Sequence, residues 1–283
     1  MTEIELPAMA SIGPAASRLN QAGQISKALR DFSRGMSMVS LWTFLGWRDV
    51  AKNYSRSVLG PLWLTLSMGV TVASLGLLYS QIYKINVSEY LPFLAVGFIL
   101  WNLIGGSITE ACHVFSGSGH FIRQTNLPLT IYTMRLVCTQ LIVFAHNFLI
   151  YIAVALIFRI WPGPIILLLL PALAIISLNC LFAGMILGPL CARFRDVPLI
   201  IASVVQVAFF LTPIIWRADL LPDRAYFVQY NPFYHLLEIA RVPLLGGTIH
   251  TESWIVCLVM TAVHGLIAFS VFARVRSRIA YWV

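Results

Sequence analysis

The sequence predicts an all-α integral membrane protein with six transmembrane helices. Apolar residues make up 59% of its 283 residues and charged residues only 11%, and the mean hydropathy is +0.83. Both values lie far from those of a soluble domain. A helix needs about 20 mostly apolar residues to cross roughly 30 Å of hydrocarbon. We therefore expect spans at residues 62–83, 91–115, 136–158, 164–190, 198–216 and 253–273.

Residues 38–60, ahead of the first span, mix apolar and charged side chains, as in a helix that lies in the membrane interface. This segment ends in "VLGPLW", where Gly60 permits a sharp turn and Pro61 suits the first turn of a helix. The sequence predicts an interface helix that turns into the first span, and the alternative is a plain basic flank. The residues that mark the interface helix are Trp47, Arg48, Asp49 and Lys52.

The distribution of Lys and Arg predicts that both ends of the chain are cytoplasmic. With that orientation fourteen of the nineteen basic residues fall on the inner side and five on the outer side, in agreement with the positive-inside rule. Residues 1–37 are then expected to form a cytoplasmic segment, for which we have no functional assignment. Residues 61–273 are expected to form the transmembrane domain, and residues 274–283 a basic cytoplasmic tail. The net charge of +8 suits attraction to anionic membrane lipids, and no nucleic-acid recognition motif is present.

Several stretches resemble one family of transporters. The segment "WRDVAKNYSRSVLGPLW" is similar to the one before the first span in permease subunits of type-2 ABC exporters of polysaccharides, above all O-antigen exporters and their capsule and teichoic-acid relatives. The stretches "LPFLAVGFILWNLIGGSI", "RFRDVPLIIASVVQVAFFLTPIIW" and "NPFYHLLEIARVPLLGG" agree, and the tail "RVRSRIAYWV" fits. The resemblance covers residues 40–283 in order.

The resemblance implies a homodimeric permease of the bacterial inner membrane that works with a separate ABC ATPase subunit. It implies export of a lipid-linked polysaccharide, with O-antigen as the first expectation and capsule as the next. This chain contains no GxxxxGK[ST] phosphate loop. We therefore expect ATP and Mg to bind the partner subunit, and this chain to have no cofactor and no catalytic residue and not to be an enzyme on its own.

The loop "SGSGHFIRQTNLPLTIYTMR" between spans two and three is short and basic. The family architecture implies a coupling helix in this region that contacts the ATPase. An ordinary basic loop that obeys the positive-inside rule is the alternative. The turn "CARFRDVP" is the candidate for a smaller contact, and a local solvated pair of Arg195 and Asp196 is the alternative there. The residues expected at the coupling surface are His120, Phe121, Ile122, Arg123, Gln124, Leu127 and Arg195.

Ionisable and polar residues inside the spans are few. Glu110 and His113 are one helical turn apart, which favours a satisfied pair near the headgroups over a proton relay. For His146, Asn147 and His264 we expect interhelical hydrogen bonds rather than catalysis or metal binding. The five cysteines occur singly, without a metal-like cluster, and are expected to be packing thiols.

Aromatic residues gather in the outer halves of spans one, two and five. Flat rings with polar tips suit stacking against sugars that slide past, and the family resemblance makes a lining of the substrate path the hypothesis. The aromatic belt at membrane interfaces is the alternative. By analogy with the family, spans one and five form the dimer contact. The residues expected along the path are Tyr79, Tyr83, Phe98, Trp101, Phe209 and Phe210.

The segment 217–252 is too long for a simple turn. Asn231-Pro232 and Gly246-Gly247 bracket a possible amphipathic helix at 233–242. Relatives place short outer helices here before the last span, and such a helix would cap the translocation path. A surface helix without a role in the gate is the alternative.

Other function classes fit the sequence less well. A membrane enzyme acting on lipid-linked sugars needs clustered acidic or His residues, whereas the chain has eleven acids and no DxD pair in a membrane-facing loop. A secondary carrier often shows related halves, and no internal repeat is visible. A type-2 ABC permease for a drug or a lipid is the main alternative.

Overall fold

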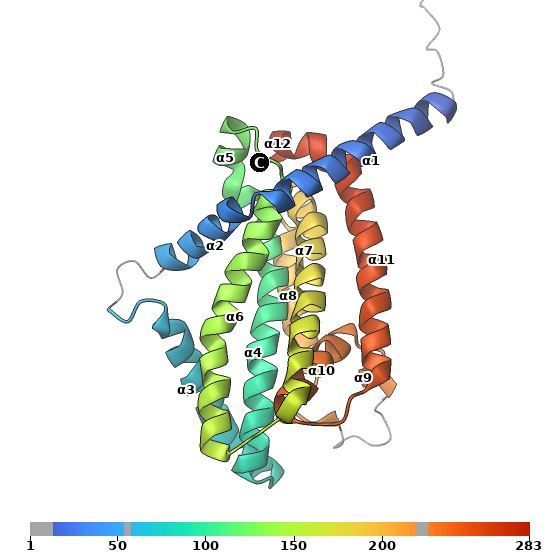
Figure 1. The fold of residues 1–283 in the computed structure, drawn as a ribbon. Coiled ribbons are helices and arrows are strands. Elements are labelled where there is room, and N and C mark those ends of the chain that lie inside the picture. Colours follow the sequence, from blue (N-terminus) through green and yellow to red (C-terminus); the bar gives the residue numbers. More distant parts are fainter. Residues whose placement is uncertain (1–13, 54–57, 219–225) are drawn as a thin grey trace, which may run out of the picture.

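The computed structural model describes residues 14–53, 58–218 and 226–283, and these residues form helices and no strand. Figure 1 shows long helices side by side, with shorter helices at both ends of the bundle. The longer helices are α1 (Pro14–Ser37), α2 (Val39–Asn53), α3 (Leu62–Tyr83), α4 (Val87–Ala111), α6 (Thr130–Phe158), α7 (Leu169–Arg193), α8 (Val197–Leu211), α10 (Pro232–Leu245) and α11 (Thr251–Val275). The shorter ones are η1 (Ser116–Ser118), α5 (Gly119–Gln124), η2 (Gly163–Leu168), α9 (Tyr226–Gln229), η5 (Arg276–Arg278) and α12 (Ile279–Trp282).

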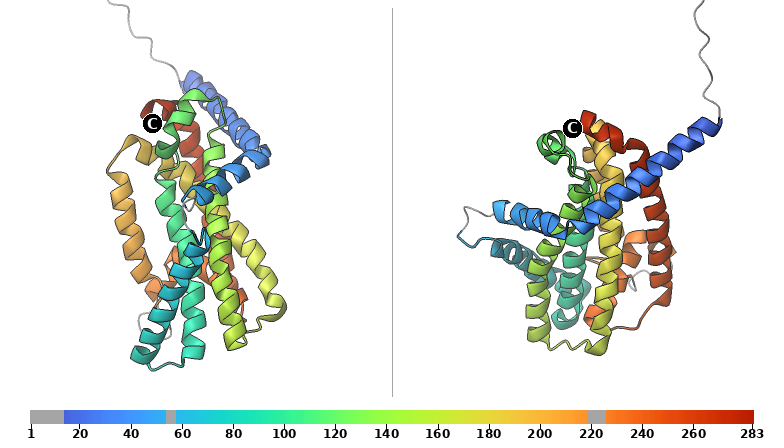
Figure 2. Two further views of the ribbon diagram at one scale, coloured as in Figure 1. Left: turned by 90° about the vertical axis from the view of Figure 1, so that its left-hand side faces the viewer. Right: turned by 45° about the horizontal axis from the view of Figure 1, so that its top comes forward.

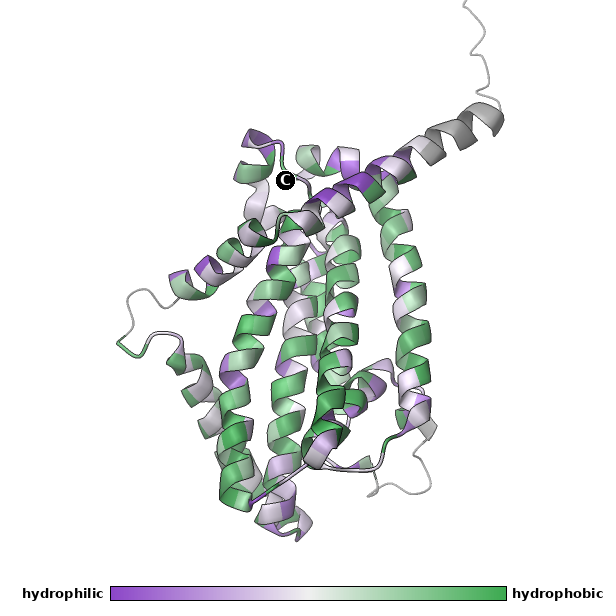
Figure 3. Ribbon diagram, in the orientation of Figure 1, coloured by the Kyte–Doolittle hydropathy of each residue, from purple (hydrophilic) through white to green (hydrophobic). Residues whose placement is uncertain are grey.

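The chain is an all-α integral membrane protein. Within the described residues five helical segments are long and apolar enough to cross a membrane, and Figure 3 shows hydrophobic residues along their length. α8 has 15 residues, about 22 Å at 1.5 Å per residue, which is shorter than the hydrocarbon layer. The count of six spans therefore stays a prediction. The five long segments are Leu62–Tyr83, Val87–Ala111, Thr130–Phe158, Gly163–Arg193 and Thr251–Trp282.

The helices differ from the expected spans mainly at their ends. The expected fifth span, 198–216, corresponds to α8, which stops at Leu211. Pro213 explains this stop, because a proline pushes the preceding residue out of helical conformation, and Thr212 is extended with φ −92° and ψ 136°. The helices that correspond to the expected spans 91–115 and 136–158 begin earlier than expected, at Val87 and Thr130. The expected span 164–190 begins as η2 and continues as α7. α11 extends beyond both ends of the expected span 253–273.

The turn into the first long helix has the expected form. Gly60 has φ +55°, a left-handed conformation that favours glycine, and α3 begins at Leu62 directly after Pro61. The expected interface helix, 38–60, is observed as α2, which ends at Asn53. Residues 54–57 of the expected segment lie outside the described part of the chain.

The two ends of the bundle carry different elements. α1, α2, α5 and α12 lie at one end, which we call the basic end, and α9 and α10 lie at the other, which we call the α10 end (Figures 1 and 2). The first and last described helices, α1 and α12, therefore lie at the same end. α8 starts beside α7 at the basic end and reaches α10, where the Asn231 amide donates to the Thr212 hydroxyl at 3.0 Å.

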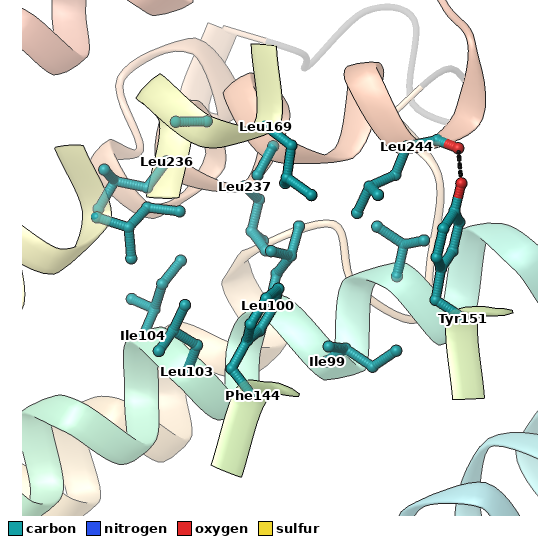
Figure 4. Close-up of a cluster of buried hydrophobic side chains, with 14 of the residues drawn as sticks. Ile99, Leu100, Leu103, Ile104, Phe144, Tyr151, Leu169, Leu236, Leu237 and Leu244 are labelled. Carbon is teal, nitrogen blue, oxygen red and sulfur yellow. Dashed lines mark hydrogen bonds between the residues drawn. The ribbon is translucent and has the colours of Figure 1, made fainter. Parts of the chain in front are cut away.

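α4 is the central helix and packs against α3, α6, α7, α8 and α10. Its apolar side chains form the middle of a buried cluster that also includes residues of α6, α7 and α10 (Figure 4). Tyr151 of α6 closes this cluster, because its hydroxyl donates to the Leu244 carbonyl of α10 at 2.6 Å. Core packing and this buried hydrogen bond thus help to hold α10 against the bundle.

α3 and α8 are the least enclosed of the long apolar helices. α8 has no buried residue, and only Val72, Gly76 and Ser80 are buried on α3. Large apolar side chains such as Leu78 and Phe210 are 55% and 61% exposed. Apolar surface of this extent requires cover by lipid or by another protein chain.

Candidate functional site

A polar cavity of about 630 Å³ lies between α2, α3, α4 and α6, toward the basic end. It opens among helices that are otherwise mostly apolar, and it combines both signs of charge with amide and hydroxyl groups. Polar groups among membrane-spanning helices are costly unless they pair or face water. Residues that give it this character are Asp49, Lys52, Glu110, His113, Arg135 and Gln140.

One wall of the polar cavity is an ion pair between α2 and α6. Both oxygens of Asp49 accept hydrogen bonds from the guanidinium group of Arg135, whose side chain is 26% exposed. The close approach of the helices requires glycine at position 46, because a Cβ there would lie 2.9 Å from the Cys138 sulfur. Partial exposure limits such a pair to about 1 kcal/mol. The pair fixes the position of α2 along the cavity.

The residues expected to mark the interface helix face in two directions. Trp47 is 53% exposed and Arg48 is also exposed, so these two point away from the bundle. Asp49 turns inward to α6, and Lys52 lines the polar cavity. The outward pair suits the headgroup layer, and the location of α2 in that layer stays a prediction.

Glu110 and His113 both line the polar cavity and are exposed. The satisfied pair expected from their spacing does not form, because neither side chain makes an ion pair or hydrogen bond with another described residue. Helical spacing places two residues on one face, but the cavity leaves room for both to turn toward solvent. They therefore add hydrogen-bonding capacity to the cavity wall.

The side chains of polar residues in mid-helix bridge neighbouring helices in two of the three expected cases. The His264 ring of α11 lies 3.1 Å from the Asn179 amide oxygen of α7. Asn147 of α6 donates to the Asn102 oxygen of α4 at 3.3 Å. The His146 ring instead bonds to a carbonyl one turn earlier on its own helix. The interhelical bond at this residue is made by its backbone carbonyl, which accepts from the Thr65 hydroxyl of α3 at 2.8 Å.

The aromatic residues expected along a path form two separate groups, and none of the six lines the polar cavity. In the first group Tyr79 and Tyr83 of α3 stack with centroids 5.7 Å apart, and Tyr83 contacts Tyr90 of α4. The Tyr90 hydroxyl donates to the Ile215 carbonyl at 2.5 Å. Tyr90, which no sequence pattern singled out, belongs to the same group.

The second group, which we call the Trp101 group, joins α4, α8 and α10. Phe209 of α8 lies 5.6 Å from Phe98 and 5.8 Å from Trp101, centroid to centroid. Phe210 contacts Phe209 and is largely exposed. Phe233 of α10, missed in the sequence, packs edge-on against Trp101 at 5.6 Å. The group extends from the exposed face of α8 to α10.

α10 confirms the helix expected at 233–242. The Asn231 side chain accepts a hydrogen bond from the Phe233 N–H at 3.0 Å and caps the first turn. Pro232 occupies the first position, and Gly246 ends the helix with φ +75°. The start and the end of this helix could be predicted from the sequence because the residues that determine them are adjacent to the helix.

A buried arginine fastens α10 to the bundle. Arg241 is 3% exposed, pairs with Glu238 at 3.2 Å and donates to the Pro213 carbonyl at 2.9 Å. Its guanidinium lies over the Phe93 ring, 4.2 Å from the centroid. Burial lowers the pKa of the Arg241 guanidinium, and the Glu238 carboxylate opposes that shift. A Cβ at Gly97 would lie 2.8 Å from this side chain, so glycine provides its space.

The expected coupling loop contains the short helix α5. Phe121 is 59% exposed, and Ile122 is buried against the bundle. Arg123 donates to the backbone oxygen of Val283 at 2.7 Å. Ile122 therefore anchors α5 to the bundle, whereas the Phe121 side chain is accessible to a partner. Of the remaining expected coupling residues, His120, Gln124 and Arg195 are exposed and Leu127 is half-buried.

The described part of the chain holds no group of three or more His, Cys, Asp or Glu residues placed to bind a metal ion. All five cysteines are free, and four of them are buried. Their environment is that of packing residues.

A family model described as "ABC-2 type transporter" matches residues 40–245, and the chain belongs to that membrane family. Two curated Klebsiella pneumoniae proteins named "O-antigen export system permease protein RfbA" are each 20% identical over 235 residues, which is 82% of this chain and 91% of the relative. A Myxococcus xanthus protein of the same name is 23% identical over 194 residues, covering 67% and 74% of the two chains.

Proposed function

We propose that this chain is the permease subunit of an ABC transporter that exports a lipid-linked polysaccharide across the bacterial inner membrane, O-antigen in the first place and capsule next. Relatives named as O-antigen export permeases align with most of its length. The observation that carries the proposal is the polar cavity. A sugar polymer leaving water needs hydrogen-bonding partners, and charged and amide side chains among apolar helices supply them.

In this proposal the basic end faces the cytoplasm and binds a separate ATPase that holds ATP and Mg. The bias of fourteen basic residues to five supports that orientation. The absence of a phosphate-loop motif from the sequence supports a separate ATPase. α5 supports a docking role, because it presents Phe121 on a helix anchored by Ile122. Arg195, in the turn before α8, would extend the same surface.

We further propose a homodimer in which α3 and α8 face the second copy. The exposed apolar side chains of both helices support this arrangement, and lipid is the alternative cover. Cysteine pairs introduced across α3 and α8 should form cross-links between subunits. Efficient cross-links through α6 and α7 instead would contradict the arrangement.

The aromatic residues are proposed as contacts for the sugar chain beyond the polar cavity, with α10 as the outer cap. The continuity of the Trp101 group from α8 to α10 supports this role. The interfacial belt remains the competing role for each ring.

Purification with the ATPase, followed by identification of the bound lipid, tests the function. We expect a lipid that carries a polysaccharide, and we expect that lipid to accumulate inside cells that lack the chain. A bound drug or glycerolipid without sugar, together with normal surface polysaccharide in those cells, would favour the alternative ABC permease.

A further inference from the structure

A buried carboxylate fixes helix α1, which lies outside the matched family region 40–245, to the bundle. Asp31 is 4% exposed and accepts hydrogen bonds from the Thr130 N–H at 3.1 Å and the Thr130 hydroxyl at 2.7 Å. Its other oxygen lies 2.8 Å from Arg276 Nε. Gly35 allows the approach, because a Cβ there would lie 2.9 Å from Thr130 Cβ. α1 is therefore held beside α6 and α11 (Figure 2).

A recess of about 280 Å³ lies between α1, residues 126–128 and Arg276, and we call it the basic recess. Lys27, Arg30 and Arg34 line it from α1 and are exposed. Asp31 does not neutralise them, because its charge is balanced by Arg276, with which it forms an ion pair. None of the three cationic side chains forms an ion pair or hydrogen bond with another residue that the structure describes.

This arrangement of charge favours an anion. Residues 27, 30 and 34 are three and four positions apart, so they share one helix face and repel one another. Arg and Lys together match the charge and hydrogen-bonding geometry of a phosphate group. An anion in the basic recess would relieve the repulsion and bridge α1 to residues 126–128.

The opposite face of α1 indicates where that anion comes from. Ile25, Leu29 and Met36 are 53%, 52% and 44% exposed, and their spacing of four and seven places them on one apolar stripe. A helix with an apolar stripe and a basic face lies in the headgroup layer of a membrane. We propose that the basic recess binds a phosphate-bearing anion, and that the phosphate of an anionic phospholipid is its source.

The test measures binding of phosphatidylglycerol to the purified full chain in detergent by native mass spectrometry, with phosphatidylcholine, a zwitterion whose phosphate charge is balanced by its choline cation, as the comparison without net charge. One variant combines Lys27→Gln, Arg30→Gln and Arg34→Gln. The matched control combines Arg195→Gln, Arg274→Gln and Arg278→Gln, which removes the same charge from exposed positions at the same end of the bundle. Each cation beside a lipid phosphate contributes roughly a fivefold gain in affinity, so the recess variant should bind on the order of 100-fold more weakly.

The control should retain binding close to that of the unmodified chain, and inorganic phosphate should not displace the lipid. Equal losses in both variants would overturn the site, because they would indicate general surface attraction. Unchanged binding in the recess variant would overturn it as well. Displacement by inorganic phosphate, with no preference for phosphatidylglycerol, would support the phosphate site and overturn the lipid as its source.

Discussion

At the basic end Asp49 and Arg135 pair on the wall of an open polar cavity, whereas at the α10 end Arg241 and Glu238 pair inside the protein. The first pair is about a quarter exposed, and the Arg241 and Glu238 side chains are only 4% and 12% exposed. Water that screens an exposed pair also solvates the charge that remains when one partner is removed. A buried pair has no such water, so the remaining charge is left without compensation. The comparison contrasts a pair that water reaches, on the wall of the polar cavity, with a buried pair that fastens α10 to the bundle.

Of the substitutions considered, removal of Arg241 should cause the largest loss of stability, because it loosens the attachment of α10 to the bundle. Arg241→Met leaves the Glu238 carboxylate buried without its partner and the Pro213 carbonyl without its donor. We expect a loss of about 3 kcal/mol in the free energy of unfolding, measured by thermal unfolding in detergent. Adding Glu238→Leu should recover part of the loss, since no buried charge then remains. Equal stability of Arg241→Met and the unmodified chain would show that the pair does not fasten α10.

At the basic end the expected effect falls on partner binding. Arg123→Glu reverses a charge on α5, where the side chain is exposed, and should reduce copurification of the ATPase severalfold. Membrane insertion should remain normal, as judged by the amount of permease in the membrane fraction. If copurification stays unchanged, the loop serves topology alone.

The aromatic contact between α4 and α10 is expected to matter for transport more than for stability. Trp101→Leu keeps apolar bulk but removes the flat ring that meets Phe209 and Phe233, so export should fall severalfold. The measurement is surface polysaccharide normalised to permease in the membrane. Tyr79, Tyr83, Phe98 and Phe210 provide parallel Leu variants. Wild-type export in all five would return these rings to the interfacial belt.

The smallest effect is expected for the exposed pair. Asp49→Asn removes one charge from the pair with Arg135 while water in the polar cavity still reaches the guanidinium. The free energy of unfolding should fall by about 1 kcal/mol. A loss as large as that of Arg241→Met would contradict the contrast between the two ends.

Local signals predicted the features whose determinants are adjacent in sequence. α10 was predicted because Asn231, Pro232 and Gly246 sit at its boundaries, and the turn before α3 because Gly60 precedes Pro61. Apolar runs located the long helices for the same reason.

Features that join distant segments could not be predicted from local pattern. Asp31 meets Thr130 and Arg276, which are 99 and 245 residues away. Arg241 falls within the helix expected at 233–242, and only the fold shows that it is buried and that Gly97 makes room for it. The polar cavity likewise combines residues from four helices. Such contacts depend on tertiary packing, which the periodicity of a single segment does not contain.

Photo-cross-linking from the polar cavity tests the proposed function most directly. Thr109 lines the cavity, and Leu266 on α11 is 71% exposed and serves as the control. A benzophenone amino acid at position 109, introduced in cells that make the polysaccharide, should capture the lipid-linked sugar chain, whereas the same group at position 266 should not. Capture at 266 but not at 109, or no sugar at either position while the permease is active, would contradict a polysaccharide path through the polar cavity.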